Sequence, residues 1–206
     1  MFKNYIWDFD GMLFDSYPHI TKAFQMMMEE RGIGVDYAEA KSLFEISFET
    51  CYSHYGVTEE MARRHSEFEH IYDMEPAAVP FENTLKTLEE LNRSGAKQFL
   101  FSHRGHESSQ HYLGAYGLLD YFTECVDSSY GFTPKPAPDG VLYLLGKYGL
   151  NKDETLMVGD RELDVMAGKN AGTYGCLFTK EKNVETNADF VVSDIGEIPG
   201  LDGGIK

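Results

Sequence analysis

The chain has 206 residues, of which 42% are hydrophobic and 25% charged, so it is long enough to bury a core in one large domain or in a core domain that carries an insertion. Its 34 acidic residues outnumber its 18 basic ones and give a formal net charge of -16. Such a surface repels nucleic acid and anionic membranes, and we expect neither as a partner.

The cysteines and the first apolar run bear on the compartment. Cys51, Cys125 and Cys176 are odd in number and widely separated, which predicts free thiols in a reducing compartment. Asp8 and Asp10 interrupt the first apolar run, so the pattern of a signal peptide is missing, and no stretch approaches the ~20 apolar residues of a membrane-spanning helix. These features predict a cytoplasmic protein.

The first predicted strand, about Asn4 to Phe9, is followed by a helical block. Ser16 is suited to cap a helix that runs to about Arg31, where Gly32 ends it. Three more helices are expected, over about Tyr37 to Ile46, Phe48 to Tyr55 and Thr58 to Met74. The segment 16–80 is therefore predicted to be an all-helical domain inserted directly after the first strand.

Beyond Pro80 the pattern alternates between helices and short apolar strands. The strands are expected at Lys97 to Phe101, Glu124 to Val126, Thr155 to Val158, Tyr174 to Phe178 and Asp189 to Val192. The helices are expected at Phe81 to Arg93, Glu107 to Tyr116, Asp139 to Tyr148 and Glu162 to Asn170. This alternation predicts an α/β fold with a parallel sheet, built from residues 1–15 and 81–206.

Two aspartates stand at the end of the first strand. Asp8 and Asp10 are separated by one residue, so both side chains point to the same face of an extended chain. Two carboxylates held close in a dry place stay ionised only when a cation or strong donors neutralise them. The pair is either a solvated turn or, as the other strand ends favour, part of a metal site.

Polar residues also follow other strands, and parallel sheets bind their ligands at these carboxyl ends of the strands. Ser102 follows one strand, Lys135 lies in the loop T-P-K-P-A-P, and Asp160 and Asp164 follow the strand that ends near Val158. Any one of these residues alone is typical of a cap or a solvated loop. Their joint occurrence at successive strand ends predicts one site.

The residue types fit phosphoryl transfer that uses Mg²⁺. Asp8 and Asp160 offer carboxylate oxygens to the metal, the backbone near Asp10 offers a carbonyl, and Asp164 can bind the metal through water or orient Lys135. Lys135 and Ser102 can bind phosphate oxygens. An aspartate can attack phosphorus, and a second one can protonate the leaving oxygen and then deprotonate the attacking water.

These motifs resemble those of the haloacid dehalogenase-like hydrolase superfamily, and the resemblance covers essentially the whole chain. The first motif is D-F-D-G-M-L from Asp8, the second is Ser102, the third is Lys135 and the fourth is G-D-R-E-L-D, which ends at Asp164. The resemblance implies a Rossmann-like core, a Mg²⁺ cofactor bound among Asp8, Asp10, Asp160 and Asp164, and an aspartyl-phosphate intermediate with Asp8 as nucleophile and Asp10 as general acid and base. The helical insertion resembles the cap of the phosphoglycolate phosphatase and β-phosphoglucomutase-like branch.

Three positions qualify this resemblance. Met12 stands where threonine or valine is usual, which should affect the packing of the loop more than its chemistry. His103 and Arg104 follow Ser102 in place of the commoner asparagine, and we expect one of them to contact the substrate or the cap beside the phosphate site. Asp10 is generally missing from dehalogenases of this superfamily, because a halide needs no proton, so its presence favours phosphate esters.

Three functions are compatible with the sequence. A monophosphatase that acts on a small phosphorylated metabolite is favoured. A phosphosugar mutase that uses the same aspartyl phosphate is the enzymatic alternative, and a non-catalytic phosphate-binding sensor is the third. The sequence does not distinguish a monomer from a homodimer, and it does not specify the ester.

Overall fold

The computed structural model describes residues 1–203 and divides the chain into two compact units. The core unit combines residues 1–13 with the chain from Pro80 onward, and the helical unit is the continuous segment 14–79. Among the described residues, no helix is both long enough and apolar enough to cross a membrane.

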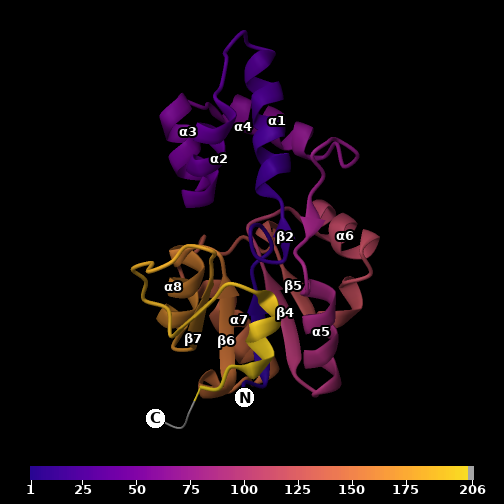
Figure 1. Cartoon of the computed structure of the whole chain (residues 1–206), viewed down its shortest axis with the longest axis vertical. Coiled ribbons are helices and arrows are strands. Elements are labelled where there is room, and N and C mark those ends of the chain that lie inside the picture. The colour runs from indigo at the N-terminus through magenta and orange to yellow at the C-terminus, as the bar shows by residue number, and fades with distance from the viewer. Residues whose placement is uncertain (204–206) are drawn as a thin grey trace. The chain divides into compact units, whose positions relative to one another are not determined.

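A six-stranded parallel sheet forms the centre of the core unit, in the order β5-β4-β1-β6-β7-β8 (Figure 1). Its strands are β1 (Asn4–Trp7), β4 (Lys97–Phe101), β5 (Glu124–Val126), β6 (Thr155–Gly159), β7 (Tyr174–Phe178) and β8 (Phe190–Val192). β1 lies in the middle, where Ile6 pairs with Phe99 of β4 and Met157 of β6. The predicted α/β fold with a parallel sheet is confirmed.

Helices cover the sheet and explain why its central strands are apolar on both faces. They are α5 (Thr84–Arg93), α6 (His106–Ala115), α7 (Asp139–Tyr148) and α8 (Glu162–Ala171), with short 3₁₀ helices η1 (Leu119–Tyr121), η2 (Ser128–Tyr130), η3 (Lys152–Glu154) and η4 (Ile195–Gly200). Ile6 and Phe99 are fully buried in a cluster with Val141 and Leu144 of α7. On α5, the Leu88 carbonyl accepts a hydrogen bond from buried Gln98 of β4, at 2.9 Å.

The helical unit has a core of its own. Its helices are α1 (Tyr17–Glu29), α2 (Tyr37–Ile46), α3 (Phe48–Tyr55) and α4 (Glu59–Glu69). Phe24 of α1 and Phe44 of α2 are fully buried and meet edge to face, with ring centroids 5.2 Å apart. The chain enters this unit through β2 (Phe14–Asp15) and leaves it through β3 (Val79–Pro80), and these two strands pair with each other.

Two helices differ from the prediction in length. α4 ends at Glu69 and not near Met74, because the Glu69 carbonyl faces the His19 ring at 3.0 Å and does not continue the helical ladder. α5 begins at Thr84 and not at Phe81, because Asn83 takes a left-handed conformation (φ 69°) that no helix can include. Other predicted ends agree with the structure to within two residues.

Candidate active site

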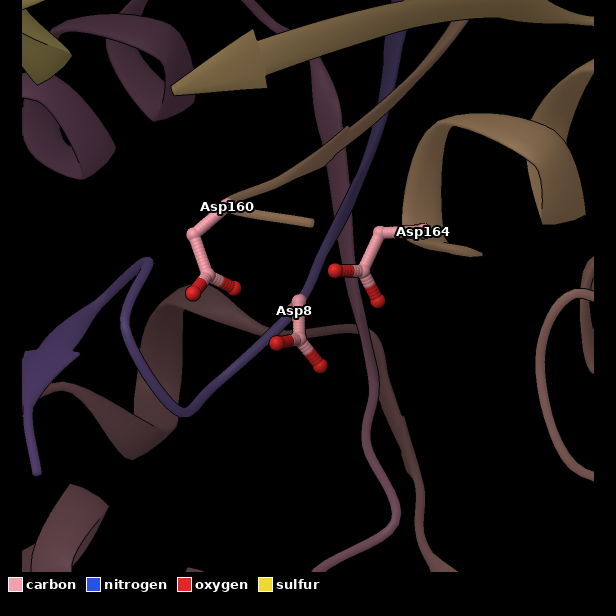
Figure 2. Close-up of side chains that lie close together, drawn as sticks. All are labelled: Asp8, Asp160 and Asp164. Atoms are coloured by element: carbon pink, nitrogen blue, oxygen red, sulfur yellow. The ribbon is translucent and has the colours of Figure 1, made fainter. Parts of the chain in front are cut away.

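Three carboxylates from two neighbouring strand ends gather at one place. Asp8 follows β1, Asp160 follows β6 and Asp164 lies in the first turn of α8, and Figure 2 shows the three side chains close together. One oxygen of each lies within 4.8 Å of the others. The sheet sets this proximity, because the Asp8 amide donates to the Val158 carbonyl of β6 at 2.9 Å. Asp8 and Asp164 are buried and Asp160 is half-buried.

Gly159 allows Asp164 to approach the end of β6. A Cβ atom at position 159 would lie 2.2 Å from the Asp164 Cβ, a distance that no pair of non-bonded carbon atoms tolerates. Asp164 Oδ2 also accepts a hydrogen bond from the Arg161 amide at 3.1 Å, which caps the start of α8. The glycine and the second aspartate of the G-D-R-E-L-D motif are thus required by the same close packing.

Lys135 binds two of the three carboxylates. Its Nζ lies 2.5 Å from Asp8 Oδ1 and 2.7 Å from Asp164 Oδ1, and its side chain is fully buried. Burial opposes the charge of Lys135, but Asp164 and Asp8 outweigh it and raise the lysine pKa above its usual value. Burial likewise opposes the ionisation of Asp164, but Lys135 and Arg161 hold the pKa of Asp164 below its usual value.

Asp8 retains an unsatisfied oxygen. Burial and the neighbouring Asp164 raise the pKa of Asp8 to about 6, although Lys135 and Arg161 oppose this rise. Asp8 Oδ2 is buried and has no hydrogen-bond partner among residues 1–203. A buried carboxylate oxygen without a donor, in a cluster of hard oxygen ligands, fits a bound divalent cation such as Mg²⁺.

Arg161 is a residue whose role the sequence did not reveal. Its guanidinium lies 3.8 Å from Asp8 Oδ2, 3.8 Å from Asp160 Oδ1 and 3.7 Å from Asp164 Oδ2, and its side chain is 10% exposed. The only signal for Arg161 in the sequence is that a basic residue stands directly after Asp160, within the otherwise acidic fourth motif. With Lys135, it brings two positive charges to a group of three carboxylates.

Asp10 lies apart from this carboxylate group and pairs with a different cation. Arg104 donates to it through Nε, at 3.2 Å from Oδ1 and 3.3 Å from Oδ2, and through Nη2 at 2.5 Å from Oδ1. The family resemblance implied that Asp10 is among the metal ligands, but the group of three carboxylates does not include it. Arg104, one of two residues expected to contact the substrate or the cap, is directed at Asp10.

Ser102 and His103 lie on the loop after β4. Ser102 is buried, and its hydroxyl oxygen accepts a hydrogen bond from the Arg104 amide at 3.1 Å while it keeps its own hydrogen to donate. His103 is exposed as a residue, but its Nε2 accepts from the Lys135 amide at 2.9 Å. Partial burial of the ring and the charge of Lys135 lower the pKa of His103 to about 4, so the ring is neutral at neutral pH and positions the lysine loop.

A sequence model of the haloacid dehalogenase-like hydrolase family matches residues 5–177. The chain belongs to this family. The matched span includes every residue of the carboxylate group, Lys135 and the Asp10–Arg104 pair. The family that the four motifs predicted is confirmed.

Haloacid dehalogenase-like relatives of this chain include phosphoglycolate phosphatases. The enzyme of Vibrio cholerae is 30% identical over 123 residues, which cover 57% of this chain and 54% of that protein, so the match spans about half of the relative. The enzyme of Yersinia pseudotuberculosis is 28% identical over 190 residues, which cover 82% and 79%. A solved structure of a hydrolase from Streptococcus pneumoniae TIGR4 is 32% identical with a TM-score of 0.63, covering 86% of this chain and 93% of that one.

Proposed function

We propose that this haloacid dehalogenase-like protein is a Mg²⁺-dependent phosphatase that hydrolyses the phosphate monoester of a small molecule. The observation that carries the proposal is the environment of Asp8: one of its oxygens is bound by Lys135, and the other is buried beside two more carboxylates with no hydrogen-bond donor in the described part of the chain. Such a carboxylate is suited to attack an electrophile whose charge a nearby cation neutralises. The phosphoryl group of an ester is an electrophile of this kind.

The first step would transfer the phosphoryl group to Asp8. An oxygen of Asp8 forms a bond to phosphorus, the bond from phosphorus to the ester oxygen breaks, and the leaving oxygen takes a proton from the Asp10 carboxyl group. The products are an alcohol and an aspartyl phosphate on Asp8. In this proposal Lys135 and the Ser102 hydroxyl bind phosphate oxygens during this step.

The second step would release phosphate. A water oxygen attacks phosphorus, the Asp10 carboxylate takes the water proton, and the bond from phosphorus to Asp8 breaks. Inorganic phosphate leaves, and both aspartates return to their starting protonation states. Asp8, Asp160 and Asp164 are the residues that would hold Mg²⁺, which when bound neutralises charge on the phosphoryl oxygens.

The relatives suggest which esters to test first. Because the relatives from Vibrio cholerae and Yersinia pseudotuberculosis are phosphoglycolate phosphatases, we propose small phosphorylated acids, and 2-phosphoglycolate in particular, as substrates. We further propose that the helical unit 14–79 serves as the cap that selects among such esters. This second proposal has its own test, in which the helical unit is exchanged and the substrate profile is compared.

The experiment is an assay of phosphate release from a panel of monoesters, with and without Mg²⁺. We expect release that needs Mg²⁺ and is abolished in Asp8→Asn, a substitution that keeps the shape of the side chain and removes the nucleophile. Retained activity in Asp8→Asn would contradict the proposal. So would the accumulation of an isomerised sugar phosphate in place of free phosphate, because a mutase returns the phosphoryl group to the substrate.

A further inference from the structure

The Arg104 guanidinium contacts four residues of the core unit, namely Asp10, Ser108, Phe9 and Tyr112. Two of its nitrogens donate to Asp10, and the third, Nη1, donates to Ser108 Oγ at 2.8 Å. Its carbon lies 5.0 Å from the centre of the Phe9 ring and 5.4 Å from that of Tyr112, within range of cation–π attraction. With its side chain only 4% exposed, Arg104 has one well-defined orientation.

The backbone around Arg104 is fixed as well. Its amide donates to Ser102 Oγ at 3.1 Å, and its carbonyl accepts from the Ser128 amide at 3.1 Å. The first bond lies within the loop after β4, and the second ties this loop to η2, which follows the neighbouring strand β5. The guanidinium is therefore presented to Asp10 by a rigid frame and not by a flexible surface side chain.

The ion pair itself is largely withdrawn from water. The Asp10 side chain is 12% exposed, and Arg104 approaches both of its oxygens. A buried pair of this kind is weak evidence of added stability, because desolvation offsets most of the attraction between the charges. Its geometry does restrict Asp10, since a planar guanidinium that contacts both oxygens limits rotation of the carboxylate.

We propose that Arg104 is a positioning residue that holds Asp10 in the orientation from which it exchanges protons with the leaving oxygen and with water. This inference rests on the proposed function. Asp10 gives its proton to the ester oxygen as the bond to phosphorus breaks. The resulting carboxylate is stabilised by hydrogen bonds from the guanidinium. The same carboxylate then takes the proton of the attacking water. Arg104 binds neither phosphate nor metal in this role.

Leaving groups that differ in their need for a proton test this role. In p-nitrophenyl phosphate the leaving group departs as a stable phenolate, whereas an alkyl phosphate such as 2-phosphoglycolate must be protonated. The quantity to compare is kcat/KM, because it covers the steps up to formation of the phosphoenzyme. We expect Arg104→Gln to lower kcat/KM for the alkyl ester roughly 100-fold more than for the aryl ester, as loss of a general acid does.

A double-mutant cycle that combines substitutions of Arg104 and Asp10 tests whether Arg104 acts through Asp10. Asp10→Asn should show the same selectivity for the aryl ester, and Arg104→Gln combined with Asp10→Asn should cost little more than Asp10→Asn alone, because the two residues act as one unit. Arg104→Lys keeps the charge and part of the hydrogen bonding, and should restore part of the alkyl activity. Arg93→Gln, an exposed arginine on α5, is the matched control.

The outcomes separate this inference from the function on which it rests. A wild-type chain that releases phosphate from neither ester overturns both. An active wild type in which the folded variants Arg104→Gln and Arg104→Lys lose activity on the two esters equally, or gain activity on the alkyl ester, overturns the role of Arg104 alone. If Arg104→Gln does not fold, as judged by circular dichroism, the comparison is made with Arg104→Lys.

Discussion

At the scale of single residues, the site is a balance of buried charges. Lys135 makes direct hydrogen bonds to Asp8 and Asp164, whereas the Arg161 guanidinium lies 3.7 to 3.8 Å from three carboxylates and is thus at the limit of ion pairing. Lys135 is therefore fixed by hydrogen bonds to two of the carboxylates, while Arg161 acts on all three mainly through its charge. A divalent cation that binds these carboxylates must do so against the charge of Arg161.

Removal of that charge gives a prediction. Arg161→Ser should raise the affinity for Mg²⁺ by about tenfold or more, because a unit charge within several ångströms of the ligands changes the binding free energy by more than 1.4 kcal/mol even at an effective dielectric constant of about 20. Isothermal titration calorimetry measures this affinity without substrate. Arg93→Ser, on the exposed face of α5, should leave it unchanged. Weaker Mg²⁺ binding in Arg161→Ser would show instead that the guanidinium organises the ligands.

The sequence predicted which residues lie together at the site better than it predicted which side chains form ion pairs with one another. Asp8, Lys135, Asp160 and Asp164 could be placed together because each follows a strand of one parallel sheet or lies in the loop after it. That Asp10 would pair with Arg104, two residues beyond Ser102, depends on side-chain rotamers and on the Phe9 and Tyr112 rings that hold the guanidinium. No spacing in the sequence encodes those contacts.

At the scale of elements, a carboxylate joins β5, η2 and α7. Glu124 Oε1 accepts hydrogen bonds from Tyr130 at 2.7 Å, Tyr143 at 3.0 Å and Lys147 at 2.9 Å. Burial opposes its ionisation, but the bonds from Lys147 and the tyrosines outweigh burial and lower the pKa of Glu124 to about 2. The edge strand of the sheet is thus attached to its covering helix through one ionised group.

This linkage predicts how stability depends on pH. A carboxylate with a lower pKa in the folded state adds stability above its unfolded pKa of about 4.5, and that contribution is lost as the pH falls from about 4.5 to about 2. Glu124→Gln should therefore lower the free energy of unfolding at neutral pH and flatten its decline in acid, where one such group contributes at most about 1.4 kcal/mol per pH unit. Urea denaturation at a series of pH values measures both effects.

The control for this prediction is Glu90→Gln, an exposed position on α5. It should run parallel to the wild type at every pH. A Glu124→Gln curve that is also parallel to the wild type would mean that the neighbouring side chains do not lower the pKa of Glu124 in the folded state.

Helix boundaries were the least predictable part of the elements. The periodicity of apolar residues located every major helix, because it reports which face is buried. The end of α4 and the start of α5 were missed, since His19 and the left-handed Asn83 act through tertiary contacts and backbone conformation. The two-residue strands β2 and β3 were missed as well, because segments so short carry no periodic pattern.

At the scale of the whole molecule, the helical unit interrupts the core unit in the sequence, but hydrogen bonds join the two core segments on either side of it. The Phe81 amide donates to the Leu13 carbonyl at 3.0 Å, and the Thr84 hydroxyl donates to the same carbonyl at 3.3 Å. These contacts lie within the core unit and do not need the residues between them. The helical segment is therefore an insertion that the core can close around.

A deletion variant tests this independence. Replacement of residues 14–79 by about four Gly and Ser residues, enough to span the short gap, should give a core that unfolds in one cooperative transition. Its affinity for Mg²⁺ should stay within about threefold of the full chain, a margin set by the usual scatter of such comparisons. Far-ultraviolet circular dichroism during thermal unfolding and calorimetry provide the measurements. A non-cooperative transition would show that the core depends on the helical segment, and Asp8→Asn in the shortened chain controls for binding elsewhere.

The central position of β1 has a consequence for synthesis of the chain. Tyr5, Ile6 and Trp7 are fully buried between β4 and β6, yet these partners are translated only after residues 97 and 155. The helical unit, whose contacts are local, can fold on the emerging chain long before then, because domains fold as units from the N-terminal side during synthesis. Of the strands in this sheet, β1 thus waits longest for both of its neighbours, and Tyr5 and Trp7 stay exposed until those neighbours have been translated.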